Sequence, residues 1–119
     1  MRVIVCGGRA YSKRAVVFAA LDQLHDHHRI TCIVTGGALG ADTLALDWAR
    51  VHHVDTEVYT ANWREFGRNA GPMRNQRMAE SGADLLIAFS GGKGTANMID
   101  VATEHNIPVR IVPDAGESE

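Results

Sequence analysis

Three short apolar runs in this chain each end in a glycine-rich turn, and each turn leads directly into a helix-like segment. The turns occupy residues 6–9, 36–42 and 90–95. Because the carboxyl ends of parallel strands lie at one edge of a sheet, such turns gather at that edge. Backbone N–H groups and helix N-termini exposed there bind anions. The pattern therefore predicts a parallel sheet with an anion-binding edge.

Strand-like and helix-like segments alternate along the whole chain, which predicts an α/β, Rossmann-like, doubly wound sheet of about five parallel strands with helices on both faces. We expect one domain over residues 1–113 and a polar tail over 114–119. Residues 61–70 are expected to be irregular, and Ser12 to cap the first helix. The expected strands are 2–6, 31–35, 55–60 (an edge strand), 84–89 and 108–112. The expected helices are 12–27, 42–52, 71–80 and 94–105.

The composition argues against several classes of protein. A formal net charge of -2 does not suit a general nucleic-acid-coating role, which needs a basic surface. No apolar run approaches the roughly 20 residues that span a bilayer, and the chain begins with a strand instead of a secretory leader. Cys6 and Cys32 are expected at opposite ends of neighbouring strands, beyond disulfide reach. We therefore expect a cytoplasmic protein with reduced thiols.

The histidines raise the question of a metal site. All are expected near helix C-termini, at the sheet edge opposite the glycine turns, where they interact favourably with the negative helix end. The cysteines also lack the paired spacing of a zinc site. We therefore expect no metal. The histidines are His25, His27, His28, His52, His53 and His105.

The second turn contains Gly36, Gly37 and Gly40 and ends in Asp42. It departs from the dinucleotide-binding pattern because Ala38 stands at the second glycine position. Asp42 has two interpretations. Its carboxylate caps the helix that it opens, or it accepts hydrogen bonds from ribose hydroxyls beside a bound phosphate.

The third turn contains Gly91, Gly92, Lys93 and Gly94, with Thr95 as a helix-capping residue. It lacks the first glycine of a Walker A loop. Three glycines and a lysine at a strand end nevertheless form a typical anion nest. In the first turn, Gly7, Gly8 and Arg9 serve either as a structural connection or as the floor of a ligand site.

Residues 62–77 depart locally from the acidic balance, with four arginines and one glutamate. Arginine suits phosphate, and Trp63 or Phe66 is placed to cover a base. The alternative is a solvated basic face or a dimer surface. The arginines are Arg64, Arg68, Arg74 and Arg77, of which the last two share a helix face.

Four motifs, at residues 5–9, 36–42, 71–75 and 89–95, resemble in this order the YspA/YpsA-like branch of the SLOG superfamily. The resemblance covers nearly the whole chain. It implies a Rossmann-like sheet and a pocket for nucleotides or nucleotide-derived ligands, including ADP-ribose-like molecules. Relatives include the LOG-type phosphoribohydrolases, which cut a nucleoside monophosphate into base and ribose phosphate. The DNA-processing protein A family has a glycine turn similar to 36–42.

The match to the phosphoribohydrolases is partial. Their P-G-G-x-G-T motif is matched except that Ser90 replaces proline, and their catalytic arginine corresponds to Arg74, followed by Asn75 where lysine is usual. Their catalytic glutamate falls on Met98. Without it, Asp42 or Asp100 would have to supply the carboxylate that stabilises an oxocarbenium-like transition state, and Asp100 is expected to face solvent.

We therefore expect a protein that binds a nucleotide-derived phosphate ligand, for signalling or sequestration. The alternative is a phosphoribohydrolase with Arg74 and Asp42 as catalytic residues, and a single-stranded DNA-binding module is the least favoured. We expect no cofactor, no membrane contact and a homodimer. The expected ligand-binding residues are Gly7, Gly8, Arg9, Gly36, Gly37, Gly40, Asp42, Arg74, Asn75, Gly91, Gly92, Lys93, Gly94 and Thr95.

Overall fold

A computed structural model describes residues 1–113, and the predicted polar tail lies outside the described residues. Five parallel strands form one sheet in the order β3-β2-β1-β4-β5, which confirms the predicted Rossmann-like α/β class. The strands are β1 (Arg2–Cys6), β2 (Cys32–Thr35), β3 (Asp55–Val58), β4 (Leu85–Ala88) and β5 (Val109–Ile111). The helices are α1 (Arg14–His27), α2 (Ala41–Val51), α3 (Trp63–Phe66), α4 (Ala70–Glu80) and α5 (Lys93–Glu104), with a 3-10 turn at Gly67–Asn69.

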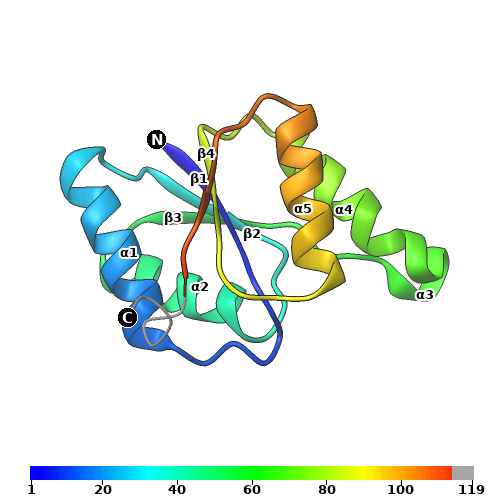
Figure 1. Cartoon of the computed structure of the whole chain (residues 1–119), viewed down its shortest axis with the longest axis horizontal. Helices are drawn as coiled ribbons and strands as arrows, with labels where there is room; N and C mark the ends of the chain where they lie inside the picture. Colours follow the sequence, from blue (N-terminus) through cyan, green and yellow to red (C-terminus); the bar gives the residue numbers. More distant parts are fainter. Residues whose placement is uncertain (114–119) are drawn as a thin grey trace.

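Helices cover the two faces of the sheet in separate layers. Figure 1 shows α1 and α2 to one side of β1 and β4, and α4 and α5 to the other. Successive residues of a strand point to opposite faces, so Val3 and Val5 pack in the core under α1 and α2. Ile4 packs in the core under α4 and α5. This burial on both faces explains why β1 is apolar from Val3 to Cys6.

The strand order places the three glycine turns side by side. β1 lies between β2 and β4, with Ile4 paired to Val34 and Cys6 paired to Ala88. The chain leaves β1 toward the face of α1 and leaves its neighbour β4 toward the opposite face, that of α5. Ligands bind at such a switch point in open α/β sheets. The register also separates the thiols: Cys32 pairs with Arg2, at the far end of β1 from Cys6. Both cysteines are free and buried.

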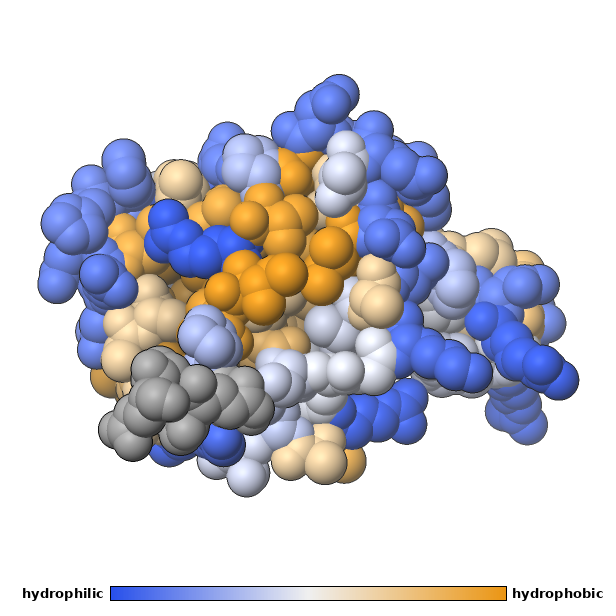
Figure 2. Space-filling view, in the orientation of Figure 1, coloured by the Kyte–Doolittle hydropathy of each residue, from blue (hydrophilic) through white to orange (hydrophobic). Residues whose placement is uncertain are grey.

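The two edge strands differ in character. β3 is polar and largely exposed, as predicted for an edge strand. β5, at the opposite edge, leaves Ile111 65% exposed. Figure 2 shows apolar residues gathered on the side of the molecule where β4 and β5 lie.

Two local predictions were wrong. Ser12 does not cap α1, because its carbonyl accepts the N–H of Arg14 and the helix begins only there. Residues 61–70 are not irregular but include α3 and the 3-10 turn. The Asn62 side chain accepts the N–H of Glu65 at 3.1 Å and donates to its carboxylate at 3.0 Å. This is a reciprocal capping pair, which starts α3.

Within residues 1–113, no helix is both long enough and apolar enough to cross a bilayer.

Candidate functional site

Gly8 joins the three glycine turns. Its N–H donates to the carbonyl of Ser90 at 2.8 Å, and its own carbonyl accepts the N–H of Ala41 at 3.3 Å. A side chain at Gly40 would meet the carbonyls of Gly8 and Arg9, and Gly40 has a φ of +82°. The turns thus approach each other so closely that glycine is required. Several glycines that the sequence assigned to a ligand are therefore explained by contacts between the turns.

The turns enclose a cleft of about 830 Å³ at the carboxyl edge of the sheet. This volume falls within the range of about 300–1,000 Å³ that is usual for small-molecule sites. We call it the glycine-turn cleft. Of the predicted ligand-binding residues, Gly40 and Gly91 do not line it. Those that do are Gly7, Gly8, Arg9, Gly36, Gly37, Asp42, Arg74, Asn75, Gly92, Lys93, Gly94 and Thr95.

Arg74 is held across the ends of two strands. From α4, its Nη1 donates to the carbonyl of Gly36 at 3.0 Å, and its Nε donates to Oδ1 of Asn75 at 2.9 Å. A side chain at Gly36 would overlap the guanidinium, so glycine makes room for it. Burial lowers the pKa of Arg74, and the nearby Asp42 carboxylate opposes that change. The result is a cation fixed inside the cleft.

Asn75 positions its neighbours from a nearly inaccessible place. It is 2% exposed, and its Nδ2 donates to Oδ1 of Asn97 at 2.9 Å and to the carbonyl of Gly94 at 3.4 Å. Because its Oδ1 also accepts from Arg74, the amide links α4 to the first turn of α5.

Asp42 is 6% exposed, and its carboxylate accepts hydrogen bonds from backbone N–H groups. Its Oδ2 accepts the N–H of Gly36 at 3.1 Å and that of Ala38 at 3.2 Å. It therefore orders the loop before α2 instead of capping the helix that it opens. Burial raises the pKa of this carboxyl group to about 6.

Asp42 should give unfolding a distinctive pH dependence. Because its folded-state pKa is above the ordinary 3.8, the folded protein binds this proton more tightly than the unfolded chain. The stability that protonation of Asp42 contributes is therefore fully present below pH 3.8 and is lost as pH rises to about 6. In urea titrations, we expect the free energy of unfolding of Asp42→Asn, relative to wild type, to rise across this window. A difference that stays flat would contradict the assignment.

Thr95 has a different place from the predicted one. α5 begins at Lys93 with Gly92 as its N-cap, and no side chain caps it. Thr95 is therefore the third helical residue, and it is 9% exposed. Its Oγ1 occupies the space that a side chain at Gly91 would need. The predicted capping role is wrong because the helix starts two residues earlier than Thr95.

The last glycines of the third turn differ from the others. An added Cβ at Gly92 or at Gly94 would have no protein atom within 4 Å. Neither position has a positive φ among the described glycines. Packing therefore does not require glycine at these two positions, which both line the cleft.

The cleft is cationic although the whole chain is acidic. Its charged lining residues are Arg9, Arg68, Arg74, Lys93 and Asp42, so four cations surround one carboxylate. Arg68 was in the basic segment noted from the sequence but not among the predicted site residues. Its segment starts with a capping pair, Asn62 and Glu65, which is the sequence signal that could have placed this wall of the cleft.

The remaining basic segment divides between cleft and surface. Trp63 lines the cleft, whereas Phe66, 41% exposed, does not. Arg77 also lies outside, with its Nη2 donating to the carbonyl of Thr60 at 2.7 Å. Met98, which the sequence resemblance sets at the position of the hydrolase glutamate, is 1% exposed and lines the cleft. Asp100 is exposed and lies outside the lining.

The histidines lie at helix ends, as expected. His25 and His52 pack against Trp48, and Nε2 of His52 lies 3.2 Å from Oδ1 of Asp22. The same oxygen accepts from the Trp48 indole at 2.8 Å, so this cluster joins α1 to α2. Over residues 1–113, no three histidine, cysteine, aspartate or glutamate side chains are grouped to hold a metal ion.

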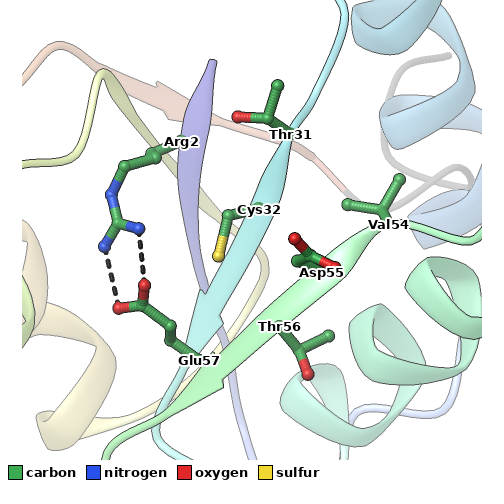
Figure 3. A pocket seen from close by; sticks show the side chains of 7 residues that line it. All are labelled: Arg2, Thr31, Cys32, Val54, Asp55, Thr56 and Glu57. Atoms are coloured by element: carbon green, nitrogen blue, oxygen red, sulfur yellow. Dashed lines mark hydrogen bonds and ion pairs between the residues drawn. The ribbon is translucent and has the colours of Figure 1, made fainter.

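A second hollow, of about 720 Å³, lies at the other end of the strands from the glycine-turn cleft, where β1, β2 and β3 begin. Figure 3 shows two of its charged side chains facing each other: Arg2 donates to both carboxylate oxygens of Glu57, at 2.7 and 2.9 Å. The hydrogen bond from Arg2 lowers the pKa of Glu57 to about 2. Arg2 is the one cation among the described residues that line this hollow, and it is paired with Glu57, so the hollow lacks the cationic character of the glycine-turn cleft.

Comparisons with known proteins agree with this architecture. Residues 1–66, just over half of the 119-residue chain, match the YspA, cpYpsA-related SLOG family. The Gene 61 protein of Mycobacterium phage D29 is 37% identical over 116 aligned residues, which cover 91% of this chain and 93% of the phage protein. A molybdenum cofactor binding protein from Rippkaea orientalis has a similar fold. Its TM-score is 0.70 at 21% identity, over 95% of this chain and 76% of that one.

Proposed function

The chain belongs to the YspA, cpYpsA-related SLOG family, and we propose that its glycine-turn cleft binds a nucleotide-derived phosphate ligand, for signalling or sequestration. The observation that carries the proposal is the charge of the cleft. Four cations line it against one carboxylate, in a chain of net charge -2. A concentration of positive charge inside a hollow attracts anions and raises their local concentration. Arg74, already fixed by three hydrogen bonds, would neutralise phosphate with little loss of side-chain freedom.

The start of α5 supports the same ligand. The first N–H groups of a helix have no partner within it, and the positive end of the helix dipole favours a bound anion. Gly92 and Gly94 leave open space beside these groups. Phosphate oxygens would approach the backbone there, with Lys93 between the two glycines adding a charge. The similar fold of a protein named for binding molybdenum cofactor supports small-molecule binding at this type of sheet.

Binding is favoured over hydrolysis by the single carboxylate of the cleft. Glycosidic cleavage uses a carboxylate to stabilise the oxocarbenium-like transition state or to activate water. Among the described residues, Asp42 is the one acid in the lining, and its Oδ2 already accepts two backbone hydrogen bonds. The nonpolar Met98 occupies the position of the hydrolase glutamate.

The proposal is tested by calorimetric titration of the protein with AMP. We expect Arg74→Ala to weaken binding by about 10- to 100-fold, because a hydrogen bond to a charged group contributes about 1.5–3 kcal/mol. The matched control is Arg77→Ala, which removes an arginine from the same helix. Like Arg74, Arg77 bonds to a backbone carbonyl, but it lies outside the cleft. Its AMP affinity should stay within about 2-fold of wild type.

The same samples distinguish ligand binding from hydrolysis. During incubation with a panel of nucleoside monophosphates, we expect no release of free base. Release that disappears in Arg74→Ala but persists in Arg77→Ala would replace the binding proposal with the phosphoribohydrolase. Equal loss of AMP binding in both arginine variants would show that the cleft is not the site.

The predicted homodimer remains a separate proposal, supported by the exposed apolar residue Ile111 on the edge strand β5. Light scattering on the purified protein measures it directly. A monomer at all concentrations would end that proposal without affecting the ligand.

A further inference from the structure

Trp63 forms one wall of the glycine-turn cleft, and it is poorly covered for so large an apolar side chain. It is 49% exposed and lines the cleft from α3. Its ring lies against the backbone of Gly71: a Cβ added there would be 2.9 Å from Cη2 of the indole. Glycine at this position therefore lets α4 support the ring while leaving much of its surface open.

Arg9 lies over the same ring. Its Cζ is 5.9 Å from the centroid of the Trp63 ring, and Arg9 is itself exposed and lines the cleft. Two planar groups with a planar ring between them stand about 7 Å apart, twice the van der Waals spacing of about 3.5 Å. The 5.9 Å from Cζ to the ring centroid is an upper limit on the separation of the two planes, so the guanidinium has to move away by at least about 1 Å to admit a base. An exposed arginine side chain makes such a shift readily, because its rotamers exchange within nanoseconds.

We propose that Trp63 and Arg9 clamp the planar base of a nucleotide between the indole and the guanidinium. This inference rests on the proposed function and specifies its ligand class: a nucleoside phosphate, in preference to a sugar phosphate that lacks a base. Nucleobases stack on aromatic side chains, and arginine stacks on planar π systems. The clamp selects an aromatic ring without selecting one particular base.

The clamp is adjacent to the proposed phosphate site. Arg9 directly follows Gly8, whose N–H donates to the carbonyl of Ser90 at the start of the third turn. The base and the phosphate of one ligand would therefore occupy neighbouring parts of a cleft of about 830 Å³. The two ends make separate contributions to affinity, so they can be measured separately.

The experiment compares AMP with ribose 5-phosphate, which carries the same phosphate and sugar but no base. We expect wild-type protein to bind AMP roughly 5- to 100-fold more tightly, the range of affinity that one stacked base contributes. Trp63→Leu should remove this advantage and leave the affinity for ribose 5-phosphate unchanged. Trp63→Tyr keeps an aromatic ring and should retain most of the advantage. The control, Phe66→Leu, alters an exposed aromatic residue of α3 outside the cleft and should behave as wild type.

Tryptophan fluorescence gives an independent signal. The other tryptophan, Trp48, is fully buried and stacks on His52. AMP should therefore quench the emission of Trp63, and the quenching should vanish in Trp63→Leu, where only Trp48 emits. Circular dichroism on each variant establishes that it is folded.

Each outcome has one meaning. An advantage of AMP that depends on Trp63 but not on Phe66 supports the clamp. Equal affinities for the two compounds, or an advantage that survives in Trp63→Leu, overturn the clamp and leave the phosphate site standing. If neither compound binds in a manner that depends on Arg74, the proposed function fails and the clamp fails with it.

Discussion

Replacement of Gly40 by alanine is expected to destabilise the protein by more than about 3 kcal/mol, a large part of the roughly 5–15 kcal/mol that holds a typical domain together. A residue with a side chain pays about 1–3 kcal/mol for a sparsely populated backbone conformation, and Gly40 has a φ of +82° and a ψ of -128°. Its Cβ would also collide with the carbonyls of Gly8 and Arg9. The turns after β1 and β2 would have to separate.

Gly82 supplies the matched control. Its φ of +87° is nearly the same, but an added Cβ would have no atom within 4 Å. Gly82→Ala therefore carries the cost of a positive φ without the collision. Urea unfolding of both variants measures the difference, which reports the close packing of the glycine turns. Equal losses of stability would contradict the account of Gly40.

Replacement of Gly94 by leucine should have the opposite balance, with ligand binding weakened and stability kept. Leucine favours helix over glycine by roughly 0.5–1 kcal/mol, and a Cβ at this helical position meets no protein atom within 4 Å. The side chain would project beside the helix N-terminus, where we place the phosphate. Displacing one charge-assisted hydrogen bond costs about 1.5–3 kcal/mol, so AMP affinity should fall by about 10-fold or more.

The control for this substitution is Ala96→Leu. Ala96 is exposed on the same helix, two residues further on, and lies outside the cleft lining. Calorimetry with AMP and thermal unfolding should both leave this variant close to wild type. If Gly94→Leu binds AMP as wild type does, phosphate does not approach this part of the turn.

The sheet and the meeting of the turns were predictable because each follows from local pattern and one topological rule. The continuous apolar run of β1 identified a strand buried on both faces, and the glycines after β1, β2 and β4 marked the carboxyl edge. What could not be foreseen is why each glycine is there. Gly40 and Gly91 serve contacts between elements distant in sequence, and only the fold reveals which atoms meet.

The structure of the chain between β3 and α4 was harder to predict for the same reason. Its low periodicity suggested irregular structure, yet the capping pair of Asn62 and Glu65 starts a helix of only four residues. Such a short element has too little hydrophobic periodicity to detect, so the capping pair is its sequence signal, and it places Trp63 in the cleft. Likewise, the hydrogen bonds that the Asp42 carboxylate accepts from two loop N–H groups could not be predicted, because they depend on the path of the turn and not on its composition.

The central claim is that phosphate ligands bind where the three glycine turns meet, and amide chemical-shift mapping with AMP tests it most directly. In a titration of ¹⁵N-labelled protein, we predict saturable shifts concentrated at Gly8, Gly36, Gly92 and Gly94, with little change at Arg2 or Glu57 at the opposite edge. Shifts confined to that opposite edge, or spectra unchanged at millimolar AMP, would contradict the claim.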